Sequence, residues 1–334
     1  MDAAAPYRES FAALLGQEPA AIAPCAHGGN NRVFRVSAGG RDYLAKCYFT
    51  GTGDTRNRLE SEWLFLEYAE AAGVPNVPRP IARDTQAHIA FYSFLEGRTP
   101  MQVNAAMVQA AAQLICNLNR RQYRELAAHL PNASESCFSA DAYIALTAQR
   151  LEQLESGEAL PQHQAGFHAL LKQMQEAFAH CRDALCHGYG EALSHEERCL
   201  SPSDFGFHNS LLSPAGQLQF IDFEYAGWDD PTKMLCDFFL HPGIPVDHAW
   251  APLFWQEIGQ SDLPLSTVAS RAALLYPVLG LRWCCIILNV FIPQWAARRA
   301  FADKDWNIGM AQAEQLAKAE HMLGLLQRNP FGAL

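Results

Sequence analysis

The hydrophobic pattern of the chain changes its period near residue 96, and this change constrains the fold more than any other feature. Residues 32–36 and 42–48 alternate apolar and polar side chains as strands do, and Ala-Gly-Gly at 38–40 between them is typical of a hairpin turn. Residues 58–72 instead place apolar side chains on one face of a helix. The N-terminal part is therefore predicted to be β-rich, with one main helix.

The rest of the chain is predicted to be mostly helical. Amphipathic runs begin at Met101 and continue to about Leu193, a short β-like segment covers residues 209–223, and helical patterns then resume. We therefore predict an α+β fold with two lobes, an N-terminal lobe over residues 1–96 and a larger C-terminal lobe over residues 97–334.

The charge balance of the chain argues against one broad class of function. Its 334 residues include 25 Lys and Arg against 35 Asp and Glu, a formal net charge of −10. A protein that binds duplex DNA needs a basic face to neutralise phosphates, so no nucleic-acid partner is expected. Hydrophobic residues make up 49% of the chain, which is enough for a large core and unlike a disordered chain.

The sequence also gives no reason to expect secretion or membrane insertion. Residues 1–11 contain neither the basic nor the apolar region of a secretion signal, so the ten cysteines are expected to be reduced thiols in a cytoplasmic protein. The most apolar stretch, 272–297, is interrupted by Pro277, Arg282 and Asn289. We expect a pair of buried core helices there and no membrane span.

Three segments carry residues suited to phosphate chemistry, and the first is the turn that contains Gly28, Gly29 and Asn30. Glycines let the backbone turn tightly and bring N–H groups close to phosphate oxygens. This turn is therefore a candidate phosphate-binding loop, although the same residues also suit an ordinary hairpin turn.

The second segment contains Lys46, which lies in an otherwise apolar strand. A buried ammonium group needs an anionic partner, because an isolated buried charge is strongly unfavourable. Glu62 on the following helix is our candidate for that partner, and Glu60 is its competitor. Lys46 could instead extend to solvent.

The third segment, residues 200–224, contains Asp204, Asn209 and Asp222 around a predicted hairpin. If the strands are symmetric about the Pro-Ala-Gly turn, Asn209 lies opposite Asp222, with Cβ atoms about 5 Å apart. An amide oxygen and a carboxylate at this spacing can hold a hard cation such as Mg²⁺ beside phosphates. Asp204 lies on the loop that enters the hairpin, where it could accept the proton of a substrate hydroxyl.

Together these segments match the requirements of phosphoryl transfer. The chain resembles the aminoglycoside phosphotransferase and choline kinase group, which has the protein-kinase-like two-lobed fold. The group's motif His-Gly-Asp-x4-Asn keeps its Asp and Asn here as Asp204 and Asn209, and its Ile-Asp-Trp/Phe-Glu motif is present at 221–224. Phe94 and Leu95, at the end of a predicted strand, resemble the hinge whose backbone would bind adenine.

The resemblance implies an ATP- and Mg²⁺-dependent kinase that phosphorylates a hydroxyl of a small molecule. Asp204 would be the catalytic residue, and Asn209 and Asp222 would be the metal ligands. Lys46 and Glu62 would position the α- and β-phosphates, under the glycine turn.

One residue departs from the group's pattern. Pro202 stands where the group has a histidine that supports the catalytic loop, two residues before Asp204. His208 and the rigid Pro202 are candidates to replace that support. The departure leaves open an alternative, in which the protein is a catalytically weak, kinase-like nucleotide-binding regulatory module.

The acceptor is not identified by the sequence, and amino alcohols, sugars and aminoglycoside-like molecules are all compatible with it. The net negative charge weakly favours a cationic acceptor, and so do aromatic and acidic residues in the C-terminal part that could contact an amine. These residues are Trp228, Trp250, Trp255, Tyr276, Trp283, Trp295, Glu224, Asp229 and Asp230. The competing interpretation, which we favour for the aromatic residues, is that they belong to the core.

Overall fold

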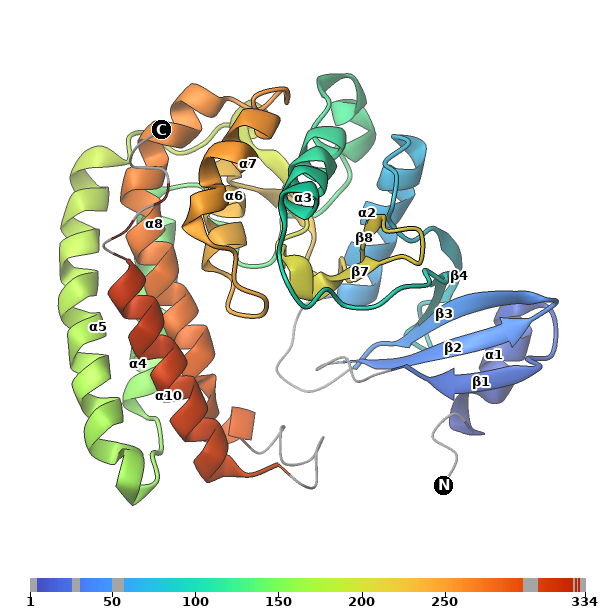
Figure 1. Cartoon of the computed structure of the whole chain (residues 1–334), viewed down its shortest axis with the longest axis horizontal. Coiled ribbons are helices and arrows are strands. Elements are labelled where there is room, and N and C mark those ends of the chain that lie inside the picture. The colour runs from blue at the N-terminus through green and yellow to red at the C-terminus, as the bar shows by residue number, and fades with distance from the viewer. Residues whose placement is uncertain are drawn as a thin grey trace. The chain divides into compact units, whose positions relative to one another are not determined.

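The structure is a computed structural model that describes residues 5–25, 31–49, 57–296, 306–326, 328 and 330 (Figure 1). The chain divides into two compact units, and each is described by itself. The first unit contains residues 1–134 and 200–228, and the second contains residues 135–199 and 229–334.

The first unit contains an antiparallel sheet with the strand order β1-β2-β3-β5-β4 (Figure 1). The strands are β1 (Ala21–Pro24), β2 (Arg32–Ala38), β3 (Arg41–Cys47), β4 (Pro80–Asp84) and β5 (Ile89–Ser93). β2 and β3 confirm the strands predicted at 32–36 and 42–48, and β5 is the strand predicted to end near Phe94 and Leu95. The edge strands β1 and β4 are additional to the prediction, because each is short and has a proline at one end, which obscures the strand pattern.

The turn between β2 and β3 has the geometry that the sequence predicts. Ala38 pairs with Arg41, so Gly39 and Gly40 form a two-residue loop. Both glycines have positive φ, 57° and 73°, as a type I′ hairpin turn requires. The resulting register holds Lys46 in the middle of the sheet, between β2 and β5.

Helix α2 (Arg58–Ala71) confirms the predicted main helix of the N-terminal part. The side chain of Asn57 caps its first turn by accepting a hydrogen bond from the N–H of Glu60 at 3.2 Å. Gly73, with φ of 67°, follows the last turn and allows the chain to leave the helix.

A second, shorter helix, α1 (Arg8–Leu15), packs its Phe11 into the core of the sheet. The ring centroid of Phe11 lies 5.1 Å from that of Phe91 in β5. Phe11 is the only buried residue of α1, so the helix has too little apolar periodicity to be recognised from the sequence. Among the described residues of this unit, the remaining helical elements are η1 (Ala5–Tyr7), α3 (Ala105–Leu118), η2 (Arg121–Ala127) and η4 (Phe207–Asn209).

The predicted hairpin after Asp204 is present as β7 (Ser210–Leu212) and β8 (Leu218–Phe220), but its register differs from the prediction by one residue. Asn209 faces Ile221, whose N–H donates a hydrogen bond to the carbonyl of Asn209 at 3.0 Å. The expectation that Asn209 lies directly opposite Asp222 is therefore wrong.

The length of the loop explains this shift. The N–H of Ser213 donates to the carbonyl of Gln217 at 2.9 Å, so three residues separate the paired positions. Gly216 occupies the last loop position with φ of 78°, as three-residue hairpin loops with a left-handed residue do. A third strand pair, β6 (Cys199–Ser201) with β9 (Gly227–Asp229), lies where the chain passes from one unit to the other.

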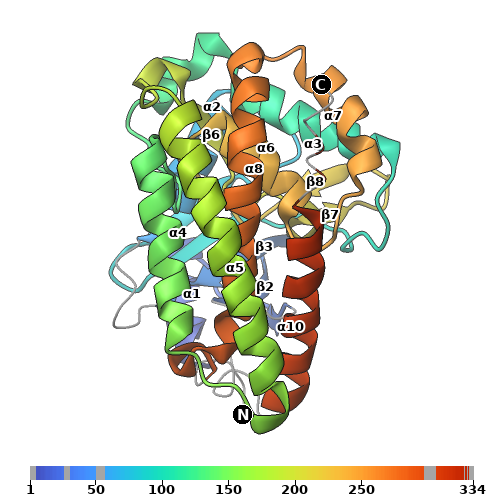
Figure 2. The same cartoon turned by 90° about the vertical axis from the view of Figure 1, so that its left-hand side faces the viewer.

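The second unit is helical and confirms the predicted helical character of the C-terminal part. Helices α4, α5, α8 and α10 lie side by side as a bundle (Figure 2). The helices whose bounds the structure describes in this unit are α4 (Ala140–Glu155), α5 (Pro161–Gly188), η3 (His195–Glu197), α6 (Pro231–Leu240), η5 (His248–Trp250), α7 (Ala251–Ile258), α8 (Leu265–Ile287), η6 (Leu288–Phe291) and α10 (Ile308–Leu325).

The apolar stretch 272–297 contains the C-terminal part of α8, the short η6 and a further helical segment at residues 293–296. Pro277 lies inside α8 without ending it. Residues Leu265–Phe291 are long and apolar enough to cross a membrane by length and composition, but 72% of the most apolar window is buried inside the structure. Burial of this extent is typical of a core helix.

Buried charges connect helices α6 and α8 within the second unit. The guanidinium of Arg282 in α8 donates to both carboxylate oxygens of Asp237 in α6 at 2.7 Å, and the indole N–H of Trp283 donates to the same carboxylate at 2.8 Å. Although burial alone would raise the pKa of Asp237, Arg282 and Lys233 hold it below its usual value. The carboxylate therefore stays ionised inside the unit.

Candidate active site

The ammonium group of Lys46 is the centre of the candidate site in the first unit. Lys46 is buried, and its Nζ donates to both carboxylate oxygens of Glu62 at 2.9 and 2.7 Å and to Oδ1 of Asp222 at 2.7 Å. The expected partner is thus Glu62, while Glu60 forms an ion pair with Arg83. The structure also brings in Asp222, which lies 176 residues away in the sequence.

The charges around Lys46 keep it protonated. Burial alone would lower the pKa of the ammonium group, but the carboxylates of Asp222, Glu62 and Glu224 outweigh this effect and raise the pKa above its usual value. One positive charge thus lies between two carboxylates in contact with it. This excess of negative charge favours binding of a further cation at the site.

The carboxylate of Glu62 accepts four hydrogen bonds from three groups. Besides the two contacts from Lys46, Oε2 accepts a hydrogen bond from the hydroxyl of Tyr48 at 2.6 Å. Oε1 accepts from the backbone N–H of Phe223 at 3.2 Å. Because Phe223 directly follows Asp222, Glu62 fixes both the lysine and the backbone that carries the second carboxylate.

Asp222 and Asn209 each present an oxygen atom that could serve as a ligand for a divalent cation. Asp222 has φ of 68°, and its side chain is 34% exposed. Among the described residues, its Oδ2 forms no hydrogen bond, and the same holds for the amide oxygen of Asn209. The carbonyl of Asn209 is bonded to Ile221, next to Asp222. Carboxylate and amide oxygens such as Oδ2 of Asp222 and the side-chain oxygen of Asn209 are the kind of ligands that Mg²⁺ prefers.

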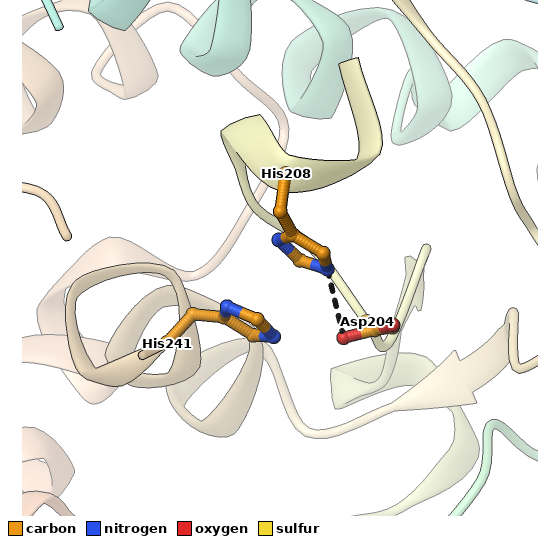
Figure 3. A group of neighbouring side chains, drawn as sticks. All are labelled: Asp204, His208 and His241. Carbon is orange, nitrogen blue, oxygen red and sulfur yellow. Dashed lines mark ion pairs between the residues drawn. The ribbon is translucent and has the colours of Figure 1, made fainter. Parts of the chain in front are cut away.

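Asp204 is bonded to the same amide. The Nδ2 of Asn209 donates to the backbone carbonyl of Asp204 at 3.0 Å and to its Oδ2 at 3.1 Å. The Nε2 of His208 lies 3.3 Å from the other carboxylate oxygen, Oδ1, as Figure 3 shows. Asp204 is 30% exposed, so the carboxylate is oriented by its neighbours and still accessible.

The backbone before Asp204 forms a tight turn. Ser203 has φ of 65°, and the N–H of Asp204 donates to the carbonyl of Pro202 at 2.9 Å. A three-residue turn with positive φ at its centre is rare and strained for a residue other than glycine.

Two serine side chains form hydrogen bonds within and around this turn. The hydroxyl of Ser203 donates to the carbonyl of Ser134 at 3.2 Å. The buried Ser201 hydroxyl accepts a hydrogen bond from the N–H of Ser203 at 2.9 Å. Pro202 thus belongs to a loop with two side-chain hydrogen bonds of its own.

The remaining predicted residues are placed as follows. Gly28, Gly29 and Asn30 lie outside the described residues. Phe94 and Leu95 follow β5 directly, both half-buried, and the guanidinium of Arg35 lies 4.6 Å from the centroid of the Phe94 ring. Neither Phe94 nor Leu95 takes part in the contacts around Lys46, Asn209 and Asp204 described above.

The structure adds Asn31 and Arg58, which the sequence did not single out, as partners of Glu224. Asn31, the first described residue after Gly28, Gly29 and Asn30, donates from Nδ2 to Oε2 of Glu224 at 2.5 Å, and Arg58 at the start of α2 lies 3.4 Å from Oε1. Glu224 comes two residues after Asp222, so it joins the residue before β2 and the start of α2 to the backbone that carries Asp222. No local signal reveals these contacts, because 193 and 166 residues separate the partners.

Tyr48 is a missed residue for which the sequence does carry a signal. It lies two residues after Lys46, and positions i and i+2 of an extended chain point to the same side. The spacing alone therefore indicates that the Tyr48 side chain lies on the same side as Lys46, where it can contact the partner of Lys46.

Solved structures of phosphotransferases have the same fold. The spectinomycin phosphotransferase APH(9)-Ia, in complex with ADP and spectinomycin, is 10% identical and superposes with a TM-score of 0.62, with 98% of each chain covered. The choline kinase LicA from Streptococcus pneumoniae is 16% identical, with a TM-score of 0.57 over 96% of this chain and 98% of LicA. APH(2″)-IIa in complex with gentamicin is 13% identical, with a TM-score of 0.59 over 97% and 98%.

At these identities the likeness shows the kinase-like fold, with its five-stranded antiparallel sheet and mostly helical C-terminal part. The comparison with curated protein sequences gave no match. A model of the phosphotransferase enzyme family, APH, matches residues 21–260, which is more than half of the chain. The chain therefore belongs to the APH phosphotransferase family.

Proposed function

We propose that the protein transfers the γ-phosphoryl group of ATP to a hydroxyl of a small molecule, with Mg²⁺ as cofactor. The observation that carries the proposal is the position of Lys46 between Glu62 and Asp222, at 2.7 Å from each. A lysine held in this way, beside free oxygen ligands and an oriented aspartate, is what phosphoryl transfer requires.

Each residue has a distinct role in this reaction. Lys46 would bind the α- and β-phosphates, and Glu62 would keep its ammonium group in place. Asn209 and Asp222 would hold Mg²⁺, which neutralises charge on the phosphates. Asp204 would orient the acceptor hydroxyl and accept its proton as the new phosphate ester bond forms and the bond to ADP breaks.

Two further predictions complete the nucleotide site. The turn at Gly28, Gly29 and Asn30 would cover the phosphates with backbone N–H groups. The backbone of Phe94 and Leu95 would bind adenine, at a boundary between two lobes near residue 96. We also propose that the protein works in the cytoplasm.

The acceptor is proposed to be an amino alcohol, a sugar or an aminoglycoside-like molecule. Several structural relatives are choline kinases or bind aminoglycosides. Two carboxylates that the sequence suggested as contacts for a cationic acceptor already form hydrogen bonds inside the second unit. Asp229 is bonded to Lys233 at 2.7 Å, and Asp230 accepts from the hydroxyls of Tyr143 and Tyr189 at 3.0 and 2.9 Å. Neutral sugars therefore belong in the test beside amines.

A screen for ADP release with Mg-ATP over amines, amino alcohols, sugars and aminoglycosides tests this function. With an acceptor in hand, Asp204→Asn should lower kcat by at least about 100-fold, because the proton acceptor is lost. Its affinity for Mg-ATP, measured by thermal shift, should stay close to that of the wild type. If Asp204→Asn phosphorylates the acceptor at the normal rate, the assignment of Asp204 is wrong.

The same experiments separate an enzyme from a regulatory nucleotide-binding module. ATP binding that needs Mg²⁺, followed by turnover, supports the kinase. ATP binding that ignores Mg²⁺, with no turnover of any acceptor, supports the module.

A further inference from the structure

We propose that Tyr48 is a positioning residue of the nucleotide site, which holds Glu62 in the orientation that keeps Lys46 ready to bind phosphate. The inference rests on the proposed function, and it adds a residue outside the lysine, glutamate and metal-ligand set of that function. Tyr48 and Tyr92 are both buried within the first unit, next to the buried Lys46 and Glu62.

The hydrogen bonds of these tyrosines have a defined direction. The hydroxyl of Tyr48 lies 2.6 Å from Oε2 of Glu62 and 2.8 Å from the hydroxyl of Tyr92. Burial, followed by the charge of Glu62, raises the pKa of Tyr48 well above its usual value, so the phenol keeps its proton. A phenol has one proton to donate, and an ionised carboxylate can only accept. Tyr48 therefore donates to Glu62, and Tyr92 donates to Tyr48.

The hydrogen bonds from Tyr92 to Tyr48 and from Tyr48 to Glu62 fix one oxygen of Glu62 independently of Lys46. The other oxygen accepts from the N–H of Phe223 at 3.2 Å. The carboxylate is thus held at both ends by groups that carry no positive charge. Such anchoring matters when nucleotide binds, because Lys46 must then turn donors from the carboxylates to a phosphate, and Glu62 must stay in place meanwhile.

Tyr48 also lies under the ammonium group. The Nζ of Lys46 is 5.7 Å from the centroid of the Tyr48 ring, within the range of a cation–π contact. Tyr48→Phe keeps this ring and removes only the hydroxyl. The substitution therefore isolates the hydrogen bond to Glu62 from the packing of the side chain.

The first experiment measures steady-state kinetics of the full-length protein with Mg-ATP and the acceptor found in the screen. Tyr48→Phe should raise the KM for ATP about ten-fold, because a hydrogen bond to a charged group typically changes an equilibrium by this factor or more. The KM for the acceptor should change little. Tyr92→Phe, which leaves the bond between Tyr48 and Glu62 intact, should shift the KM for ATP in the same direction but less.

Tyr143→Phe is the matched control. Tyr143 is also buried, and its hydroxyl donates to the carboxylate of Asp230 at 3.0 Å inside the second unit. The substitution removes an equivalent buried bond and should leave the KM for ATP unchanged. If Tyr48→Phe leaves this KM unchanged, or if Tyr143→Phe raises it as much, Tyr48 has no positioning role.

A second experiment does not depend on activity. Urea unfolding of Tyr48→Phe, Glu62→Gln and the double variant forms a double-mutant cycle. If the two side chains are in contact, the change in the free energy of unfolding of the double variant differs from the sum of the two single changes. Non-additive changes support the contact even if no acceptor is found and the kinase proposal fails. Additive changes overturn the inference whatever the activity of the protein.

Discussion

The amide nitrogen of Asn209 donates to both the backbone carbonyl and the carboxylate of Asp204, at 3.0 and 3.1 Å. These bonds fix the amide with its oxygen turned away from Asp204, and that oxygen forms no hydrogen bond among the described residues. Asn209 can therefore orient the proposed base with one atom and bind the proposed metal ion with the other.

Asn209→Ala should remove both contributions. We expect kcat to fall and the Mg²⁺ concentration needed for half-maximal activity to rise by about 10- to 100-fold, as for other residues that support metal sites. Asn104→Ala is the control, because Asn104 caps α3 by accepting from the N–H of Met107 at 3.0 Å and has no part in the site. A normal Mg²⁺ requirement in Asn209→Ala would exclude it as a metal ligand.

The two glutamates that compete for Lys46 in the sequence should behave differently. Glu62→Gln should lower kcat/KM for ATP by about 100-fold, because Lys46 loses its fixed position. Glu60→Gln should change kcat/KM by less than about two-fold and stability by less than about 1 kcal/mol, because its pair with Arg83 is partly exposed. Equal effects in kinetics would contradict the assignment of Glu62.

The turn at Ser203 predicts a difference between two small substitutions. Ser203→Ala should destabilise the protein by about 1 kcal/mol, because it loses the bond to Ser134 and keeps the positive φ. Ser203→Gly loses the same bond but relieves backbone strain of about 1 kcal/mol or more. Urea unfolding should therefore find the glycine variant more stable than the alanine variant, and the reverse order would show that the turn is unstrained.

The buried pair of Asp237 and Arg282 predicts sensitivity to acid. The pKa of Asp237 is lowered on folding, so its contribution to stability is complete above its unfolded pKa of about 4 and is lost as pH falls through the lower folded value. Asp237→Asn should cost about 3 to 5 kcal/mol at pH 7, because it leaves Arg282 and Lys233 short of a carboxylate.

The difference between wild type and Asp237→Asn should shrink in acid. Urea unfolding at pH 7 and near pH 3 measures this difference in the free energy of unfolding. Tyr143→Phe is the control, because the side chain at this buried position does not change its protonation in the folded or the unfolded state over this pH range. A difference that stays constant with pH would mean that Asp237 is not ionised in the folded protein.

Local sequence patterns predict much of the secondary structure in the N-terminal part of the first unit. Two glycines at 39 and 40 can only close a tight hairpin here, and the apolar spacing of 58–72 fits one helical face, so the hairpin and α2 follow from neighbouring residues. The same patterns identified Lys46 as a residue in need of an anion, although they could not choose between Glu60 and Glu62.

Tertiary structure decided the rest, because the remaining contacts join residues that are far apart in the chain. Asp222 reaches Lys46 across 176 residues, and no periodicity encodes that distance. The hairpin register depended on the left-handed Gly216, since one extra loop residue moves every pair. The sequence thus determined which residue types the site contains. Long-range packing decided which of them are in contact, because a buried charge is stable only when a group of opposite charge lies beside it.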